Sequence, residues 1–477
     1  MENNLTFQEF CEQRKLTPEV LADKSFTLEI DADKSCLPVD EITLAGHLSI
    51  SAMEPCALPP VIRIGGDLFV EGTGITDLPK VVEVGGKLII LNTSIREIHA
   101  GCKVQHLLAI GPSLERLPEN WVVPGDMKFE DCPFLEFPAG LDVGKLSFVG
   151  CLLSELPPRL RVRQCLNISN SFIPEIPADC EVGSLIASNC ALSKLPDNWQ
   201  VKGDVHINGS ALRVLPKGLC VEYLDICESR IKEIPADANI RCLKACYSAL
   251  ERIPDHWAIA GDLILAHCKH IQSLPNGLSV GGLLDIGGTN IQRIPADCKF
   301  FSLHAVHSAL QEIGAISGVP GRMDISYTKV KTLPDLLVVG GDFVLNHTLI
   351  THLPHNLVVG GCLSLVDSLV EDLPDDGVVG GCTNLKGSRV RIVPAFFVSA
   401  ELLFDKGVDV QAYRFSRPNF EFHPSWKYCR YKKELLLVEA RTEEGIHCKE
   451  LFSDEEIIIK RDKLGRFTSR IKQQESP

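Results

Sequence analysis

Apolar residues return along the chain with a period close to twenty. An aliphatic residue followed by proline marks each period, as in Leu78-Pro79, Leu333-Pro334 and Leu353-Pro354. With degenerate copies such as Ile98-His99 included, eighteen of these anchors follow one another at intervals of 19 to 21 residues. A fixed period of this length is typical of stacked supersecondary units.

Within one period, the apolar positions have the spacing of a short strand. Apolar residues stand 10, 8 and 3 residues before the anchor, as in Phe343, Leu345 and Ile350. The alternation of the first two predicts a strand whose intervening side chains point to the opposite face. Five residues before the anchor stands a small side chain, usually Thr or Ser, that can hydrogen-bond to backbone where the strand ends. Because one coil cannot bury its own apolar face, neighbouring coils must stack around a continuous core.

The consensus L-x-L-x-x-(T/S/C)-x-I-x-x-L-P resembles the leucine-rich repeat, with Thr, Ser or Cys in the usual Asn column. The short period and the Leu-Pro pair resemble bacterial leucine-rich-repeat proteins of the type III secreted effector class, with YopM-like or IpaH-like repeats. A recurring Val-Gly-Gly before the strand, as at Val359-Gly360-Gly361, departs from the phrase usual in those effectors. Paired glycine fits a turn that needs positive φ or a close approach of backbone.

The pattern therefore predicts a β-rich solenoid, a leucine-rich-repeat superhelix of about 18 short repeats over residues 45–404. Residues 1–44 are predicted to form a small N-terminal helical cap; Thr6 with Glu9 forms a capping-box pattern, and Thr17-Pro18 a second helix start. A secretion segment is a compatible interpretation of the same residues. Residues 405–477 lack the period and are rich in aromatic residues, which predicts a C-terminal α+β or β cap module.

Composition narrows the classes of partner and cofactor. The formal net charge of −14 argues against a broad nucleic-acid surface, and no apolar run is long enough for a membrane span. The 19 cysteines include no C-x-x-C pair, and several share the repeat columns of Thr and Ser, as Cys132 and Cys151 do. We therefore predict structural thiols, no metal site and no cofactor.

Polar and aromatic residues gather on the predicted concave face from the ninth repeat onward. Tyrosine and histidine give amphipathic contact area at low rotamer cost, which suits a protein-binding surface. The oligomeric state is left open. The predicted partner-binding residues are Tyr223, Asp225, Glu228, Lys244, Tyr247, His267, Asp285, His304, His307, Asp324, Tyr327 and His347.

One row on this face, Asp285, His304 and Asp324, invites an enzymatic interpretation, because a histidine between carboxylates can move a proton or bind a metal. An open sheet offers no pocket that excludes water, and no motif holds a nucleophile against the row. The sequence therefore favours a paired cation at His304 and assigns no catalytic residue.

The predicted function is a non-enzymatic protein-protein interaction scaffold. The resemblance implies a secreted bacterial effector, a virulence protein that binds a host signalling protein in the host cell cytoplasm; otherwise the protein would stay in the bacterial cytoplasm. One alternative is an E3 ubiquitin ligase-like effector whose repeats select substrates. Another is an unknown modifying activity in the C-terminal module. The Cys-x-Asp signature of IpaH-like ligases does not occur in the chain.

Overall fold

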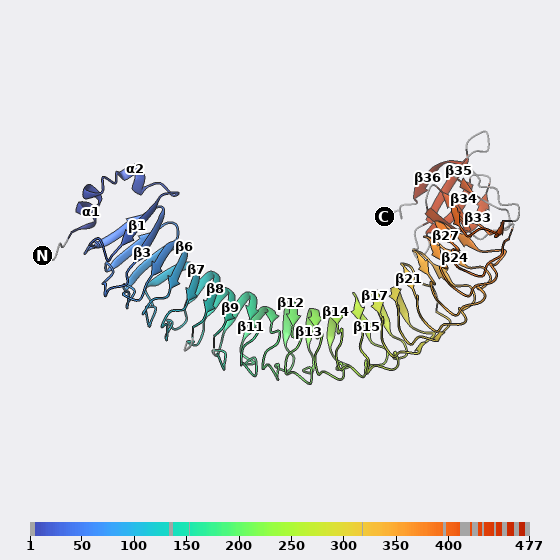
Figure 1. The fold of residues 1–477 in the computed structure, drawn as a ribbon, viewed down its shortest axis with the longest axis horizontal. Helices are drawn as coiled ribbons and strands as arrows, with labels where there is room; N and C mark the ends of the chain where they lie inside the picture. Colours follow the sequence, from blue (N-terminus) through green and yellow to red (C-terminus); the bar gives the residue numbers. More distant parts are fainter. Residues whose placement is uncertain are drawn as a thin grey trace. The chain divides into compact units, whose positions relative to one another are not determined.

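The computed structural model describes residues 5–132, 137–151, 153–316, 318–394 and 397–410, together with the backbone of six strands between residues 420 and 472. The chain divides into two units. The first comprises Met1–Ile231 and Asp237–Ile240, and the second comprises Lys232–Ala236 and Arg241–Pro477. In each unit, short strands from successive coils lie side by side (Figure 1).

The first unit begins with two short helices, α1 (Phe7–Gln13) and α2 (Pro18–Leu21). The predicted capping box is present, since the Thr6 side chain accepts from the Glu9 N–H and the Glu9 carboxylate accepts from the Thr6 N–H. Both predicted helix starts are therefore confirmed. Phe10 and Cys11 are the buried residues of α1. That this segment caps a solenoid stays a prediction.

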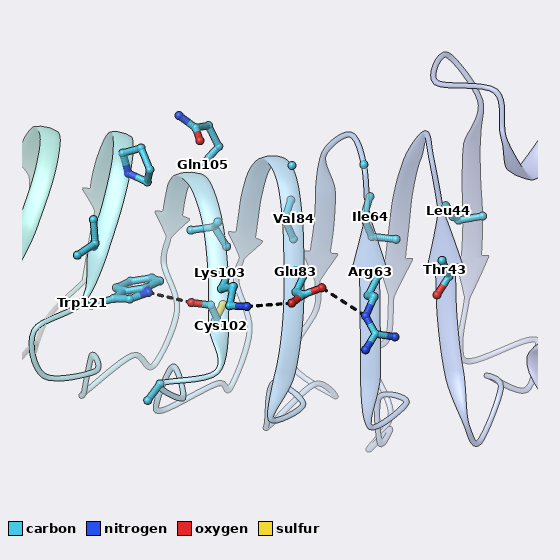
Figure 2. Close-up of a pocket in the computed structure, with 16 residues that line it drawn as sticks. Thr43, Leu44, Arg63, Ile64, Glu83, Val84, Cys102, Lys103, Gln105 and Trp121 are labelled. Atoms are coloured by element: carbon cyan, nitrogen blue, oxygen red, sulfur yellow. Dashed lines mark hydrogen bonds and ion pairs between the residues drawn. The ribbon is translucent and has the colours of Figure 1, made fainter.

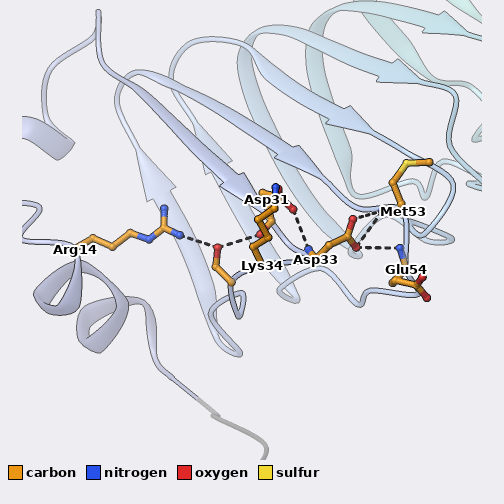
Figure 3. A network of polar contacts seen from close by, with 7 residues as sticks. Arg14, Asp31, Asp33, Lys34, Met53 and Glu54 are labelled. Carbon is orange, nitrogen blue, oxygen red and sulfur yellow. Dashed lines mark hydrogen bonds and ion pairs between the residues drawn. The ribbon is translucent and has the colours of Figure 1, made fainter.

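A polar network ties the helices to the first coils (Figure 3). Arg14 donates to the Glu29 carbonyl at 3.2 Å and to the Ser35 hydroxyl at 3.0 Å. The Asp33 carboxylate accepts from the backbone N–H groups of Met53 and Glu54, each at 2.9 Å. The bonds to Asp33 satisfy backbone donors at the bend that follows the strand ending at Ser51.

The strands of the first unit run in parallel, one repeat apart. Leu48 lies opposite Leu68, Leu68 opposite Leu88, and Leu88 opposite Leu107, and all four are buried. Each apolar column thus becomes a continuous core. The strands are β1 (Thr27–Asp31), β2 (Glu41–Leu44), β3 (His47–Ser51), β4 (Val61–Ile64), β5 (Leu68–Glu71), β6 (Val81–Leu91), β7 (Cys102–Ile110), β8 (Val122–Glu130), β9 (Asp142–Val149), β10 (Arg161–Asn167), β11 (Glu181–Ile186), β12 (Gln200–His206) and β13 (Cys220–Asp225).

The second unit repeats the arrangement with shorter strands. Leu303 lies opposite Met323, Met323 opposite Phe343, and Phe343 opposite Leu363, again all buried. The predicted β-rich solenoid is confirmed by these parallel registers. The strands are β14 (Asn239–Lys244), which begins in the first unit, β15 (Ala258–Ile259), β16 (Leu263–Ile264), β17 (Ser279–Asp285), β18 (Arg293–Ile294), β19 (Lys299–His304), β20 (Glu312–Ile313), β21 (Met323–Asp324), β22 (Val338–Val339), β23 (Phe343–Val344), β24 (Val358–Val359), β25 (Leu363–Ser364), β26 (Val378–Val379), β27 (Cys382–Asn384), β28 (Ile392–Val393), β29 (Glu401–Leu403) and β30 (Asp409–Val410).

Beyond the repeats, six strands pair in chain order as one antiparallel sheet. The sequence allowed either an α+β or a β module here. Four residues of its aromatic run, Tyr413, Phe415, Phe422 and Trp426, lie outside the described residues. The strands are β31 (Phe420–Glu421), β32 (Tyr428–Tyr431), β33 (Glu434–Thr442), β34 (Gly445–Glu450), β35 (Glu456–Arg461) and β36 (Phe467–Lys472).

The paired glycines serve close backbone approach. A Cβ atom at Gly85 would lie 2.4 Å from the Gly65 carbonyl oxygen, and one at Gly360 would lie 2.0 Å from the Gly340 oxygen. The second glycine of each pair links coils, as where the Gly361 N–H donates to the Gly341 carbonyl at 3.0 Å. A side chain at the first glycine would push neighbouring coils apart.

Hydroxyls in the Thr/Ser column bond to the strand end, as predicted. Thr328 Oγ1 donates to the Ile325 carbonyl at 2.7 Å, and Ser308 Oγ donates to the Ala305 carbonyl at 2.7 Å. The column is not uniform. Among the described residues, four members of the column have buried hydroxyls without a hydrogen-bond partner: Ser171, Ser210, Ser229 and Ser368.

Candidate functional site

The candidate site is built on the residue that directly precedes the Thr/Ser/Cys column in each coil, here called the turn column. The strand has ended at this residue, and the backbone turns with positive φ, as at Asn92 (47°) and Tyr327 (58°). The sequence placed these residues on the strand. The structure corrects this, because they occupy the left-handed turn that follows the strand.

The composition of the turn column differs between the two units. In the first unit it holds glycine, asparagine and aspartate, the residues that tolerate left-handed backbone, with Glu228 as the last member. In the second unit the same turn carries aromatic rings. Its members there are Tyr247, His267, Gly288, His307, Tyr327, His347, Asp367 and Gly387.

These rings stack on one another from coil to coil. The centroids of Tyr247 and His267 lie 4.7 Å apart at an interplanar angle of 10°. Tyr327 stacks on His307 and on His347, each at 4.3 Å. The five residues Tyr247, His267, His307, Tyr327 and His347, interrupted by Gly288, are called the ring column below.

Stacking leaves the ring edges facing outward. Tyr247 is 62% exposed and Tyr327 is 47% exposed, which is unusual for large side chains already packed against neighbouring rings. Since ring faces within the column cover each other, the hydroxyls and imidazole nitrogens at the edges are the groups left to meet a partner. The column ends at an ion pair, with His347 Nε2 3.5 Å from the Asp367 carboxylate.

The predicted row Asp285, His304 and Asp324 does lie on three neighbouring strands in register. His304 Nδ1 is 2.9 Å from an Asp285 oxygen. Asp324 instead accepts from Arg322 at 2.9 Å and from the Ser326 hydroxyl at 2.7 Å. The row is therefore a hydrogen-bonded Asp285–His304 pair beside a separately satisfied carboxylate. Asp324 is only 8% exposed, because these local donors cover it, which corrects its predicted exposed position.

Three predicted residues remain: Tyr223 and Asp225 belong to the first unit, and Lys244 belongs to the second. In the first unit, the Tyr223 ring lies 5.4 Å from that of His206. His206 also approaches the Asp225 carboxylate, at 3.8 Å. Asp225 is 9% exposed, again more buried than predicted. In the second unit, Lys244 lies on β14 opposite Ile264 and is half-buried. His206, which was not among the predicted residues, occupies the same row as Asp225.

Another surface feature, an open groove of about 610 Å³, lies in the first unit (Figure 2). A ladder of alternating charges crosses it. Glu83 accepts from Arg63 Nε at 3.3 Å and from Lys103 Nζ at 3.2 Å, and Arg63 also approaches Glu41 at 3.3 Å. Each of these exposed charges is thus already paired within the ladder.

The described residues contain no group of three His, Cys, Asp or Glu side chains arranged to hold a metal ion. Their seventeen cysteines are free thiols. Neither of the helices in this part of the chain has the length and apolar character that crossing a membrane would require.

Solved structures similar to this chain include leucine-rich-repeat proteins. YopM from Yersinia enterocolitica is 19% identical over 83% of this chain and 93% of that chain, with a TM-score of 0.43. YopM of Yersinia pestis, described as a leucine-rich effector protein, is 16% identical over 75% and 86% of the two chains, with a TM-score of 0.33. A leucine-rich-repeat protein of Leptospira interrogans is 13% identical over 72% and 84%, with a TM-score of 0.28.

The fold is a leucine-rich-repeat solenoid. The sequence matches no protein-family profile and no curated protein. The assignment therefore stands on the parallel registers, the apolar columns and the hydrogen-bonded Thr/Ser column of this chain.

Proposed function

We propose that this protein is a non-enzymatic scaffold that binds another protein through the ring column and the adjoining sheet face of the second unit. The single observation that carries the proposal is the ring column itself. Five coils of one unit place stacked aromatic rings at a turn where the rest of the chain uses glycine, asparagine and acidic residues.

The left-handed backbone at these turns suggests that the aromatic residues are kept there for function. Left-handed backbone costs an L-residue roughly 1–2 kcal/mol, and glycine or asparagine avoids most of this cost. Strain of this kind concentrates at functional positions. Tyrosine retained at such turns with its ring exposed, as at Tyr247 and Tyr327, is therefore best explained by contact with a partner.

The nature of the partner follows from the surface around the column. The ring edges offer both hydroxyls and imidazole nitrogens, and the nearby Asp285–His304 pair adds further polar groups. Such a mixed surface fits a folded protein partner, where aromatic anchors and a polar rim combine. In line with the resemblance of the repeats to secreted effectors, we propose a host signalling protein as the partner and the host cell cytoplasm as the place of action.

The test is affinity capture from host cell lysate with the full-length protein. A triple variant, His307→Asn, Tyr327→Asn and His347→Asn, removes three rings while keeping a residue that the same turn carries at Asn92 and Asn189. We expect the partner captured by the wild type to be lost or reduced at least tenfold. His352→Asn with His355→Asn is the matched control, since both imidazoles lie outside the ring column and pair with aspartates. Undiminished capture by the triple variant would refute the proposal.

A further inference from the structure

Two cysteines face each other on the exposed sheet face of the second unit. Cys362 directly precedes β25, and Cys382 is the first residue of β27. The register pairs Leu363 with Thr383, so the two cysteines lie opposite one another in neighbouring coils. In-register strands lie about 4.8 Å apart, which falls within the roughly 4.4–6.8 Å between the Cα atoms of a disulfide.

The two residues are in direct contact. The Cys382 backbone N–H donates to Cys362 Sγ at 3.2 Å. Room for this sulfur comes from Gly381, where a Cβ atom would lie only 2.8 Å from Cys362 Sγ. Both side chains are half-buried, so small solutes reach them from the open face.

The surroundings give the two thiols different reactivity. Burial and the neighbouring Cys362 thiol raise the pKa of Cys382 to about 11. The Cys362 sulfur accepts the Cys382 backbone N–H, which holds it against the neighbouring coil. Because Cys382 keeps its proton more tightly, we assign Cys362 as the attacking sulfur and Cys382 as the sulfur that resolves the product.

We propose that Cys362 and Cys382 form a hydroperoxide-reactive dithiol that closes to a disulfide between neighbouring coils. The Cys362 thiolate attacks one oxygen of hydrogen peroxide, the O–O bond breaks, and the released hydroxide takes a proton to become water. Cys362 is then a sulfenic acid. The Cys382 sulfur attacks the Cys362 sulfur, the S–O bond breaks, and a second water leaves with the thiol proton. Two thiols lose two electrons, and one peroxide gains them.

A buried cysteine pair in the first unit provides an internal comparison. Cys132 and Cys151 also share a column in neighbouring coils, but they are only 1% and 8% exposed. Hydrogen bonding from Cys132 lowers the pKa of Cys151 to about 7. If thiolate content alone decided reactivity, this pair would oxidise first; if access decides, Cys362 and Cys382 would.

The test treats the reduced full-length protein with hydrogen peroxide at one equivalent, blocks remaining thiols and maps the peptides by mass spectrometry. We expect a Cys362–Cys382 cross-link with the loss of two hydrogen atoms, formed at least tenfold faster than any oxidation of Cys242. Cys242 is the matched control, because it is half-buried in the same row but has Asp262 in the next coil.

Two variants separate the roles of the sulfurs. With Cys382→Ser, Cys362 should accumulate as sulfenic acid that a dimedone probe traps. With Cys362→Ser, Cys382 should stay reduced. A first cross-link between Cys132 and Cys151, or a Cys362 that stays reduced in the wild type while Cys242 is oxidised, would overturn the proposal without any bearing on partner capture by the ring column.

Discussion

At the scale of single residues, the repeat is a set of columns, and each column imposes one physical demand. The turn column demands left-handed backbone, and the column after it demands a small side chain that fits the core. Tyr327 meets the first demand poorly and still stacks between two histidines. The residues that violate a column's demand are therefore the ones that call for a functional explanation.

The demand for left-handed backbone predicts how Tyr327 responds to substitution. Tyr327→Asn keeps a residue suited to φ of 58°, so its free energy of unfolding should stay within about 1 kcal/mol of wild type. Tyr327→Val puts a β-branched residue there and should be less stable than the Asn variant by about 1–2 kcal/mol. Urea denaturation measures both. Equal stability of the two variants would show that the left-handed turn does not select against β-branched residues.

The Thr/Ser column offers a matched pair of serines. Ser308 Oγ donates to a carbonyl, so Ser308→Ala should cost about 1 kcal/mol. Ser210 is buried without a hydrogen-bond partner among the described residues, so Ser210→Ala should be neutral or stabilising by up to about 1 kcal/mol. Denaturation of the two variants side by side checks the difference. A larger loss at Ser210 than at Ser308 would contradict the assigned hydrogen bonds.

At the scale of the coil, the turn that follows each anchor contributes a side chain to the core, in place of the helix that packs there in other repeat proteins. Trp121 is 6% exposed, and its Nε1 donates to the Cys102 carbonyl at 2.9 Å. Cys102, Cys180 and Cys298 share one position of this turn and are buried. The cores of these three coils are thus closed partly by thiols whose pKa is raised by burial.

These thiols predict a loss of stability at alkaline pH. Burial raises the pKa of Cys180 and of Cys298 to about 11, from an ordinary value of 9.0. As the pH rises, the unfolded chain therefore loses these protons before the folded chain does. The contribution of these thiols to the free energy of unfolding is constant below pH 9 and should fall by about 1–3 kcal/mol per thiol between pH 9 and 11. Urea denaturation with a reductant, at pH 7.5 and pH 10.5, measures the fall.

Removing one of these thiols tests the linkage. Cys180→Ala should start from a lower stability at pH 7.5, because it opens a small cavity, but should lose less stability on going to pH 10.5. An unchanged pH-dependent loss in this variant would mean that other groups cause the alkaline unfolding.

At the scale of the whole chain, much of the architecture could be predicted from the sequence, because a stacked coil repeats the same constraints about every 20 residues. Leu48, Leu68 and Leu88 recur at the period and fall in one buried column. From the sequence, the paired glycines could serve either positive φ or a close approach of two backbones. The structure shows that they serve close approach between neighbouring coils. The left-handed turn at Tyr247 was not predicted from its own residue type, since a bulky residue such as tyrosine rarely adopts positive φ.

The left-handed turn at the residues of the ring column was indicated by the residue types at the same position in the first half of the chain. Asn92, Asn170 and Asn189 occupy the same position as Tyr327, and asparagine commonly takes positive φ. Aligning the coils by this position would have moved the tyrosines from strand to turn. The burial of Asp324 had no such signal, because it depends on donors from Arg322 and Ser326 in three dimensions.

Nearest-neighbour stacking predicts that damage stays local. Gly360→Ala would force a Cβ atom to within 2.0 Å of the Gly340 oxygen, which should destabilise the adjacent coils by about 1–3 kcal/mol. Hydrogen exchange should speed up in β23, β24 and β25 and stay unchanged in β5. Gly111→Asn is the control, since its neighbour in the turn column is Asn92 and only a flexible side chain must move. Uniformly faster exchange would rule out nearest-neighbour behaviour.

The close match between Val338–Pro354 and the phrase that follows it, Val358–Pro374, has a consequence for how the molecule can change. Because Val338 lies opposite Val358 and Phe343 opposite Leu363, a gene duplication of one such phrase would insert a ready-made layer and leave every contact above and below it intact. Insertion or loss of one whole phrase would therefore lengthen or shorten the solenoid by one coil without changing the packing of the other coils.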